Sequence, residues 1–127
     1  MAEKEEKLIL VIDDDRDMLE AIKIMLESAG FAVGLAVDGK QGLEKVEELN
    51  PDLIIVDMMM ETVDAGVKVA EKIKKMKSAV PIFLLSSIGE ATSYNLDTSA
   101  IGFAGVIQKP LMPSMLIPLL RKKLHIA

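Results

Sequence analysis

The chain has 127 residues, 50% of them hydrophobic, and a formal net charge of −5 at pH 7. We expect residues 1–127 to form one domain with a buried core. The acidic balance argues against direct binding to nucleic-acid phosphates, and the absence of cysteine excludes disulfides and thiolate metal sites. The single histidine, His125, argues against a His-rich zinc centre and a Ser-His-Asp triad. With 3% aromatic residues, a base-stacking platform is also disfavoured.

The start of the chain carries no targeting signal. Residues 1–7 form a charged N-terminal extension, whereas a secretory signal would have an apolar segment before a small-residue cleavage site. No apolar run in the sequence is long enough to span a bilayer. We therefore expect a cytoplasmic protein with no membrane partner.

In the first half of the chain, strand-like apolar runs alternate with segments of helical period. The run over 8–12 has no polar alternation, which is typical of a strand covered on both faces. The predicted elements are this strand, a helix over about 18–29 that stops at Gly30, a weaker strand over 31–37, and a helix that begins after Asp38-Gly39 and ends at Asn50.

The second half repeats the alternation. In chain order it predicts a strand over 53–56, a helix to about residue 77, a strand over 82–85, a weaker helix over 90–101, a strand over 106–107 and a helix over about 113–124. Pro118 lies inside the last helix, where it removes one backbone hydrogen bond, so we expect a kink or a late start there. Five strands alternating with five helices predict an α/β fold with a doubly wound parallel sheet.

Polar residues follow four of the predicted strands at the point where each ends. Asp13-Asp14, Asp57, Ser86 and Lys109 occupy these positions. Each alone has a simpler interpretation, since acids and serine also cap helices and a lysine before proline is common on a surface. Because ligands of such sheets bind beyond the carboxyl ends of the strands, the set as a whole favours a functional site.

The chemistry of this set indicates phosphoryl transfer. Three close carboxylates repel one another unless a cation is present, and oxygen ligands with water in the remaining positions suit Mg²⁺. A lysine and a hydroxyl add donors for phosphate oxygens. One carboxylate could itself act as the nucleophile and form an aspartyl phosphate.

The chain resembles a response-regulator receiver domain of two-component signalling over essentially its whole length. The resemblance is carried by Val11-Ile12-Asp13-Asp14-Asp15, by the run from Pro51 to Met60, by the run from Pro81 to Ser87, and by Lys109-Pro110. It implies a flavodoxin-like sheet of strand order 2-1-3-4-5.

The resemblance also implies roles for individual residues. Asp57 would be the phospho-acceptor, and Asp13 and Asp14 would hold Mg²⁺ together with Asp57 and the backbone carbonyl of Met59. Ser86 would be the switch hydroxyl that moves to the phosphoryl group, and Lys109 would pair with the phosphate. The Lys109–Pro110 bond is expected to be cis.

The sequence departs from the family pattern at several positions. Val106 occupies the place of the family's aromatic switch residue, either as a muted switch or as a neutral strand substitution. Ser87 replaces the usual Ala or Gly, and Glu61 replaces a proline in a loop that carries one extra residue before its glycine. Met59 and Ile88 are apolar where the family controls access of water, so we expect a long-lived phosphorylated state.

The function that follows is a phosphoryl-accepting receiver whose phosphorylated state changes partner binding. The expected partners are a sensor histidine kinase or phosphotransfer protein and a downstream target on the face of helix four, strand five and helix five, whose outward end carries Arg121, Lys122 and Lys123. The receiver would catalyse only its own phosphorylation and dephosphorylation.

Other functions compete with this one. A phosphorylation-independent interaction module is favoured by Val106 and the altered loop. A Mg²⁺-dependent phosphohydrolase is less consistent, because Met59 stands where such enzymes carry a second aspartate. A flavodoxin is disfavoured because no Ser/Thr/Gly-rich phosphate loop follows the first strand.

Overall fold

The computed structural model of the chain describes residues 6–58, 60, 65–77, 79–86 and 104–126. Its elements in chain order are β1 (Leu8–Ile12), α1 (Arg16–Ser28), β2 (Ala32–Ala36), α2 (Gly39–Leu49), β3 (Leu53–Asp57), α3 (Ala65–Met76), β4 (Ile82–Ser86), β5 (Gly105–Gln108) and α6 (Pro113–Lys123). The strand predictions are confirmed to within a residue or two. The helix predicted over 90–101 lies outside the described residues.

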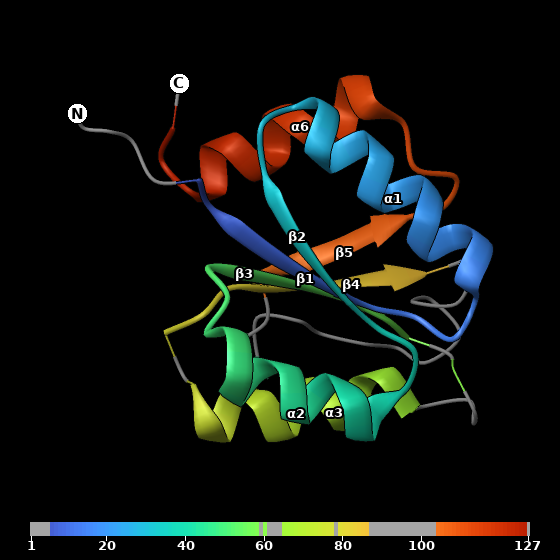
Figure 1. Cartoon of the computed structure of the whole chain (residues 1–127), viewed down its shortest axis with the longest axis vertical. Helices are drawn as coiled ribbons and strands as arrows, with labels where there is room; N and C mark the ends of the chain where they lie inside the picture. Colours follow the sequence, from blue (N-terminus) through green and yellow to red (C-terminus); the bar gives the residue numbers. More distant parts are fainter. Residues whose placement is uncertain (1–5, 59, 61–64, 78, 87–103, 127) are drawn as a thin grey trace.

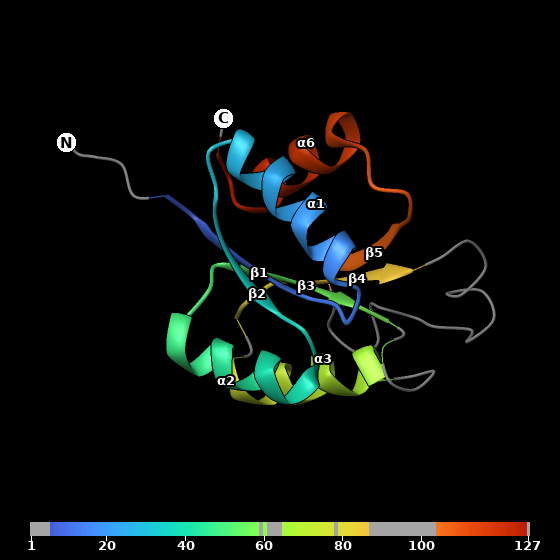
Figure 2. The same cartoon turned by 45° about the vertical axis from the view of Figure 1, so that its right-hand side comes forward.

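The five strands form one parallel sheet in the order β2-β1-β3-β4-β5, which confirms the predicted topology. Helices α1 and α6 cover one face of the sheet, and α2 and α3 cover the other (Figures 1 and 2). Because all strands run the same way, their ends define two opposite ends of the molecule. We call these the carboxyl end and the amino end of the sheet.

The core is divided into two layers by the sheet, as the apolar runs predict. Successive side chains of a strand point to opposite faces, so Ile9 and Val11 pack with α1 and α6, whereas Leu10 and Ile12 pack with α2 and α3. All four are fully buried. The alternation anchors β1 and β3 in the middle of the molecule, and thereby fixes the position of the residues that follow each strand.

Short polar side chains set where the first two helices begin. The carboxylate of Asp15 accepts from the backbone N–H groups of Asp17 and Met18 at 3.0 and 3.2 Å, and Asp38 caps α2 by accepting from Gln41 at 2.8 Å. Of the acidic run after β1, Asp15 is therefore the capping residue. Asp13 and Asp14 remain for another role.

The last helix departs from the prediction in one detail. It starts at Pro113, a favourable first position, and it continues through Pro118 to Lys123. Of the kink or late start expected from Pro118, the late start is therefore wrong. Within the described residues, none of the helices has the length and apolar character that crossing a lipid bilayer requires.

Candidate functional site

Three carboxylates meet at the carboxyl end of the sheet. Asp13 and Asp14 follow β1, Asp57 ends β3, and the two strands are paired neighbours with Ile12 opposite Val56. One oxygen from each of the three acids lies within 4.8 Å of the others. Asp13 is fully buried and Asp57 is 5% exposed, while Asp14 is exposed to solvent. The sequence expectation that these three acids converge is confirmed.

Lys109 brings one positive charge to the cluster. Its Nζ lies 3.0 Å from Asp57 Oδ2 and 4.0 Å from Asp13 Oδ2. The Lys109 backbone N–H donates to the Ser86 carbonyl at 2.8 Å, which ties the segment after β5 to the end of β4. The Lys109–Pro110 bond is cis, as expected. The Lys109 side chain thus reaches the acids from the segment after β5, which is two strands away from β3.

Ser86 ends β4 and is fully buried. In the ladder between β3 and β4, Asp57 lies opposite Leu85, so Ser86 is one residue further along the neighbouring strand. The structure therefore brings Asp13, Asp14, Asp57, Ser86 and Lys109 to the same end of four strands, β1, β3, β4 and β5.

The electrostatics of the cluster centre on Asp13. The pKa of Asp13 is raised from 3.8 to about 7, chiefly by burial and also by the adjacent Asp57 carboxylate, although the Asp15 backbone N–H and Lys109 lower it. Asp13 Oδ1 accepts from that N–H at 3.0 Å. Asp13 Oδ2 has no hydrogen-bond partner among the described residues. One lysine therefore does not balance the negative charge of this site.

These features fit a hard divalent cation. A buried carboxylate oxygen without a hydrogen-bond partner is costly unless something binds it. The three convergent groups are all oxygen donors, and two buried acids beside an exposed one leave an open side for water. The donor set of Asp13, Asp14 and Asp57 can accommodate a metal ion of the Mg²⁺ type.

A glycine that the sequence analysis noted only as part of the loop after the third strand holds the acceptor strand in place. The backbone N–H of Gly66, in the first turn of α3, donates to the Met58 carbonyl at 3.0 Å. A Cβ atom at Gly66 would overlap the backbone carbonyl of Asp57. Only glycine permits this approach of α3 to β3. The structure has Gly66 in the first turn of α3, where glycine is otherwise unfavourable, and its position so early in a helix is the signal that could have identified it.

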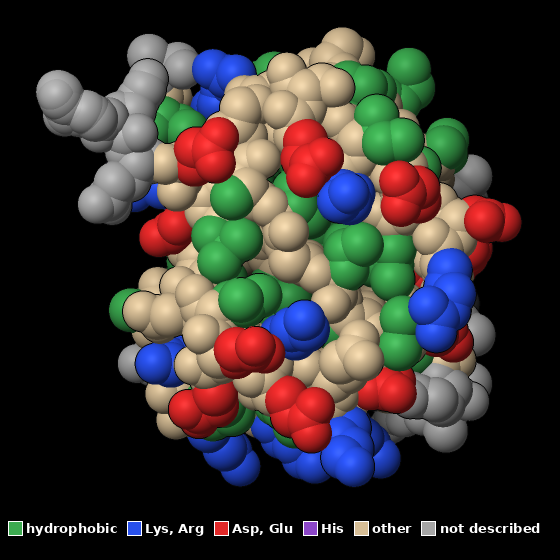
Figure 3. Space-filling view, in the orientation of Figure 1, with side chains coloured by type: hydrophobic (Ala, Val, Ile, Leu, Met, Phe, Trp, Pro, Cys, Tyr) green, Lys and Arg blue, Asp and Glu red, His purple; other side chains and the backbone are tan. Residues whose placement is uncertain are grey.

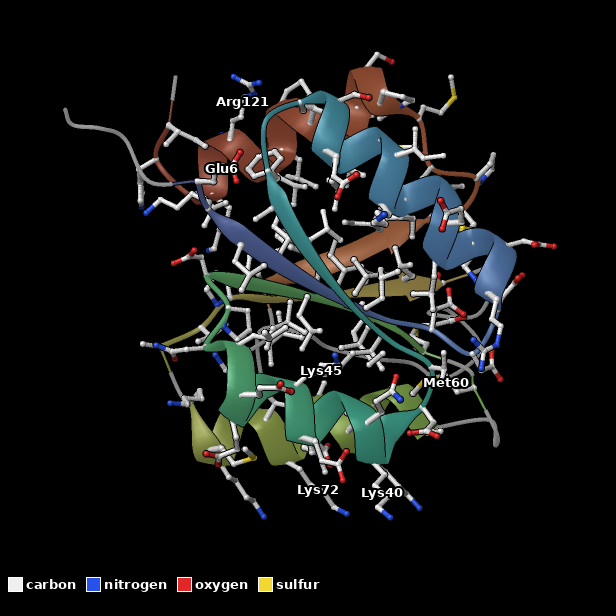
Figure 4. All side chains as sticks on the ribbon, viewed as in Figure 1. Glu6, Lys40, Lys45, Met60, Lys72 and Arg121 are labelled. Atoms are coloured by element: carbon white, nitrogen blue, oxygen red, sulfur yellow. The ribbon has the colours of Figure 1, made fainter. Side chains whose placement is uncertain are left out.

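Of the other predicted site residues, the structure describes Val106 and not Met59, Ser87 or Ile88. Val106 lies on β5, is half-buried and packs against the core layer beneath α2 and α3. Met60, which was not among the predicted site residues, is half-buried near the carboxyl end of the sheet (Figure 4). The expectations for Met59, Ser87 and Ile88, and for the loop from Glu61 to Asp64, lie outside the described residues.

Comparison with protein families gives one match that covers most of the chain. The family described as the response regulator receiver domain matches residues 9–121. Among curated proteins, the chain is 34% identical over 117 residues to the DNA-binding response regulator MtrA of Mycolicibacterium paratuberculosis, covering 92% of this chain and 51% of that protein. It is 33% identical over 107 residues to the alkaline phosphatase synthesis transcriptional regulatory protein PhoP of Bacillus subtilis, covering 84% of this chain and 44% of that protein.

Solved structures give the same fold. A CheY-like response regulator receiver domain protein from Methanospirillum hungatei superposes with a TM-score of 0.82 at 26% identity, covering 95% of both chains. The chemotaxis protein CheY4 of Vibrio cholerae superposes with a TM-score of 0.83 at 25% identity, covering 93% of this chain and 98% of that one. The chain spans about half the length of the curated relatives it matches and nearly all of these structures.

Proposed function

The chain belongs to the response regulator receiver domain family, and from this premise we propose that Asp57 accepts a phosphoryl group from a histidine kinase or phosphotransfer protein. The observation that supports this most directly is the contact of 3.0 Å between Asp57 Oδ2 and Lys109 Nζ inside a nearly buried acidic cluster. A carboxylate beside a single ammonium group can act as a nucleophile toward phosphorus. The ammonium group is then in reach of the transferred phosphoryl oxygens.

The transfer step requires a carboxylate oxygen and a leaving imidazole. An oxygen of Asp57 forms a bond to phosphorus while the bond from phosphorus to the donor's imidazole nitrogen breaks, and the imidazole keeps that electron pair. Phosphorylation adds about −1.5 to −2 charges to a site that is already acidic. Lys109 compensates part of this charge, and the hydroxyl of Ser86 donates a hydrogen bond to the phosphoryl group.

The residues that would hold Mg²⁺ are Asp13, Asp14 and Asp57, with the backbone carbonyl of Met59 as a further ligand. The unpartnered Asp13 Oδ2 and the convergence of three carboxylates within 4.8 Å support this assignment. When bound, the ion supplies positive charge to the phosphoryl oxygens. Asp13 also contributes without the metal, because its hydrogen bond from Asp15 fixes the turn between β1 and α1.

Phosphorylation would then alter a binding surface. Contacts of Ser86 and Lys109 with the phosphoryl group exist only in the phosphorylated state, and such differential contacts shift a two-state equilibrium. The proposed target surface is formed by β5, by α6 and by the helix that the sequence predicts over 90–101. Exposed Met115 and Leu119 on α6, and Met112 directly before it, support it. Arg121 is half-buried and donates to the Ala29 carbonyl at 3.1 Å, so Lys122 and Lys123 are the cations that α6 exposes for an acidic partner.

Further parts of the proposal concern lifetime, place and partners. The apolar side chains of Met59 and Ile88, with Ser87 between Ser86 and Ile88, would limit access of water to the phosphoryl group and slow its loss. The protein would act in the cytoplasm and would turn over no external substrate. The relative MtrA is named as a DNA-binding regulator and is about twice as long, and we assign no DNA binding to these residues.

A second function is favoured by one observation. Val106 packs into the core layer beneath α2 and α3, where it has no ring to move between a buried and an exposed position. The protein would then bind its partner irrespective of phosphorylation. The two functions differ in whether Asp57 substitution changes partner binding.

The experiment that tests the proposed function is phosphorylation by a small phosphodonor. The protein is incubated with phosphoramidate with and without Mg²⁺, and its intact mass is recorded. We expect the mass of one phosphoryl group to be added only with Mg²⁺, and Asp57→Asn to abolish the gain. Matched Asp52→Asn, at the other end of β3, should be phosphorylated like the wild-type protein. An unchanged mass under all conditions would favour the phosphorylation-independent module.

A further inference from the structure

A cavity of about 480 Å³ lies at the amino end of the sheet, on the opposite side of the molecule from the carboxylate cluster. It is lined by Lys7 before β1, Asp52 before β3, Lys74 of α3, and Lys123 and His125 at the end of α6. Figures 1 and 2 show the start of β1 and the end of α6 side by side at this end of the molecule. Of these residues, the proposed function uses Lys123 alone, as one of the cations that α6 exposes to a partner.

The lining of this cavity is basic although the protein as a whole is acidic. Among the described residues that line it, Asp52 is the one acid, and its Oδ2 already accepts from the Leu8 backbone N–H at 2.8 Å. The cations come from Lys7, Lys74 and Lys123, which lie far apart in the sequence. Since the net charge of the chain is −5, this local excess of lysine does not follow from composition.

Lysines at the carboxyl ends of helices can simply compensate the negative charge of the helix dipole. This role accounts for only part of the three lysines. Helices α3 and α6 both end here, and each helix end carries about half a negative charge. Lys74 donates to the Val80 carbonyl at 3.3 Å, and Lys123 is in the last turn of α6. Lys7 precedes β1 and is not part of either helix. Three lysines against Asp52 and two helix ends leave an excess of about one positive charge, before His125 is counted.

The region is an open hollow whose volume is large enough for a small ligand. Its volume falls in the range of small-molecule sites, about 300–1,000 Å³. A second hollow of about 350 Å³ adjoins it, sharing Ala104, Lys123 and His125 and adding Lys122 and the apolar side chains of Phe83 and Leu119. The two hollows together offer a cationic part and an apolar wall.

A second group of lysines provides a contrast. Along α2 and α3 the exposed cations alternate with exposed acids, and Figure 3 shows both colours on this part of the surface. Lys40 and Lys72 extend away from the body of the protein (Figure 4). These side chains line none of the cavities described here, so they form a solvated mixed surface rather than a site.

We propose that the cavity at the amino end of the sheet binds a compact polyanion with two or more phosphate groups. The ammonium groups of Lys7, Lys74 and Lys123 hold the phosphates, because compact point charges suit phosphate oxygens. The ligand joins three segments that are distant in sequence, so it stabilises the folded state. The phosphates come either from inorganic diphosphate or from a nucleoside diphosphate whose base lies against Phe83 and Leu119.

The test is a titration of the full 127-residue chain followed by amide chemical shifts. Inorganic diphosphate and ADP are added separately at low ionic strength without Mg²⁺. We expect saturable shifts at Lys7, Lys74 and His125. The dissociation constant should rise about tenfold or more in Lys7→Ala/Lys123→Ala and change less than twofold in the matched variant Lys40→Ala/Lys72→Ala. Tighter binding of ADP than of diphosphate would identify the nucleotide as the source, and equal binding would identify the phosphates alone.

Three outcomes would overturn the proposal. They are shifts confined to the segments around Asp57 and Lys109, shifts spread over all lysines without saturation, and equal dissociation constants in the two double variants. The more conservative Lys123→Gln, at an exposed position, gives the same comparison if the double variant unfolds. Because the carboxylate cluster is untouched by these substitutions, failure of this proposal would leave phosphorylation at Asp57 unaffected.

Discussion

The two ends of the same parallel sheet carry opposite charge. At the carboxyl end, Asp13, Asp14 and Asp57 surround one lysine, and one buried carboxylate oxygen lacks a hydrogen bond among the described residues. At the amino end, lysines surround Asp52, whose carboxylate is held by a backbone N–H. An acid that is satisfied by the backbone has a structural role, whereas an unsatisfied acid in a cluster indicates a missing cation.

The largest expected effect is on the unfolding free energy when Gly66, at the carboxyl end, is replaced. Gly105, at the amino end, is the comparison. Gly66→Ala places a methyl group against the Asp57 backbone carbonyl, and because neither backbone can move freely we expect a loss of about 3 kcal/mol or more in unfolding free energy. Gly105→Ala, at the start of β5, meets only the ring of Phe83 at 3.3 Å and should cost less than about 1 kcal/mol. Urea denaturation of both variants measures the difference. Equal losses would mean that α3 does not hold the acceptor strand as described.

The second prediction compares one acid from each end. Asp13→Asn removes a buried carboxylate from the cluster, so Mg²⁺ affinity should fall about 100-fold, whereas Asp52→Asn should leave it within twofold. Isothermal titration calorimetry of the two variants measures both affinities. Weakening of similar size in both would show that Mg²⁺ responds to overall charge rather than to this site.

The third prediction concerns pH. The folded protein keeps a proton on Asp13 up to about pH 7, whereas the unfolded chain loses it near pH 3.8. The folded state therefore binds more protons between these values, so the unfolding free energy of the metal-free protein should fall as pH rises from about 4 to 7, by about 2–4 kcal/mol, and level off above. Denaturant melts at several pH values measure this slope.

The control for the pH dependence is the uncharged analogue. Asp13→Asn has no group to titrate at this position, so its slope should be flatter and it should be more stable than the wild-type protein at pH 8 without Mg²⁺. A wild-type stability that rises steadily from pH 4 to 8 would contradict the raised pKa of Asp13.

The smallest effect is expected on α6. Arg121→Gln removes a hydrogen bond to the Ala29 carbonyl and should lower the unfolding free energy by about 1 kcal/mol, whereas Lys122→Gln, at an exposed position, should change it by less than about 0.5 kcal/mol. Thermal unfolding of both variants checks the order. The reverse order would mean that Arg121 is not engaged with the end of α1.

The fold and most of the site follow from local sequence patterns. Apolar runs such as Leu8 to Ile12 predict buried parallel strands. A polar residue directly after each run must then lie at the carboxyl end of the sheet. The run from Asp13 to Asp15 illustrates the limit. Taken alone, its sequence favours capping, and the structure shows Asp15 in that role while it brings Asp13 and Asp14 to within 4.8 Å of Asp57.

Features that depend on contacts between distant segments were not predictable in this way. Gly66 matters because α3 approaches the Asp57 backbone, which no local pattern reveals. The basic cavity joins Lys7, Lys74 and Lys123, whose separation in sequence hides their proximity. The late start inferred from Pro118 failed because Pro113 favours an earlier first turn. The roles of Ser87 and Ile88 remain predictions.

The most direct test of the account locates the phosphoryl group itself. After incubation with phosphoramidate and Mg²⁺, the protein is treated with borohydride, which reduces an aspartyl phosphate to homoserine, and the peptides are sequenced by mass spectrometry. The account predicts homoserine at Asp57 alone, and none when Mg²⁺ is omitted. Homoserine at Asp13 or Asp14, or none in the presence of Mg²⁺, would contradict the assignment of Asp57 as the phospho-acceptor.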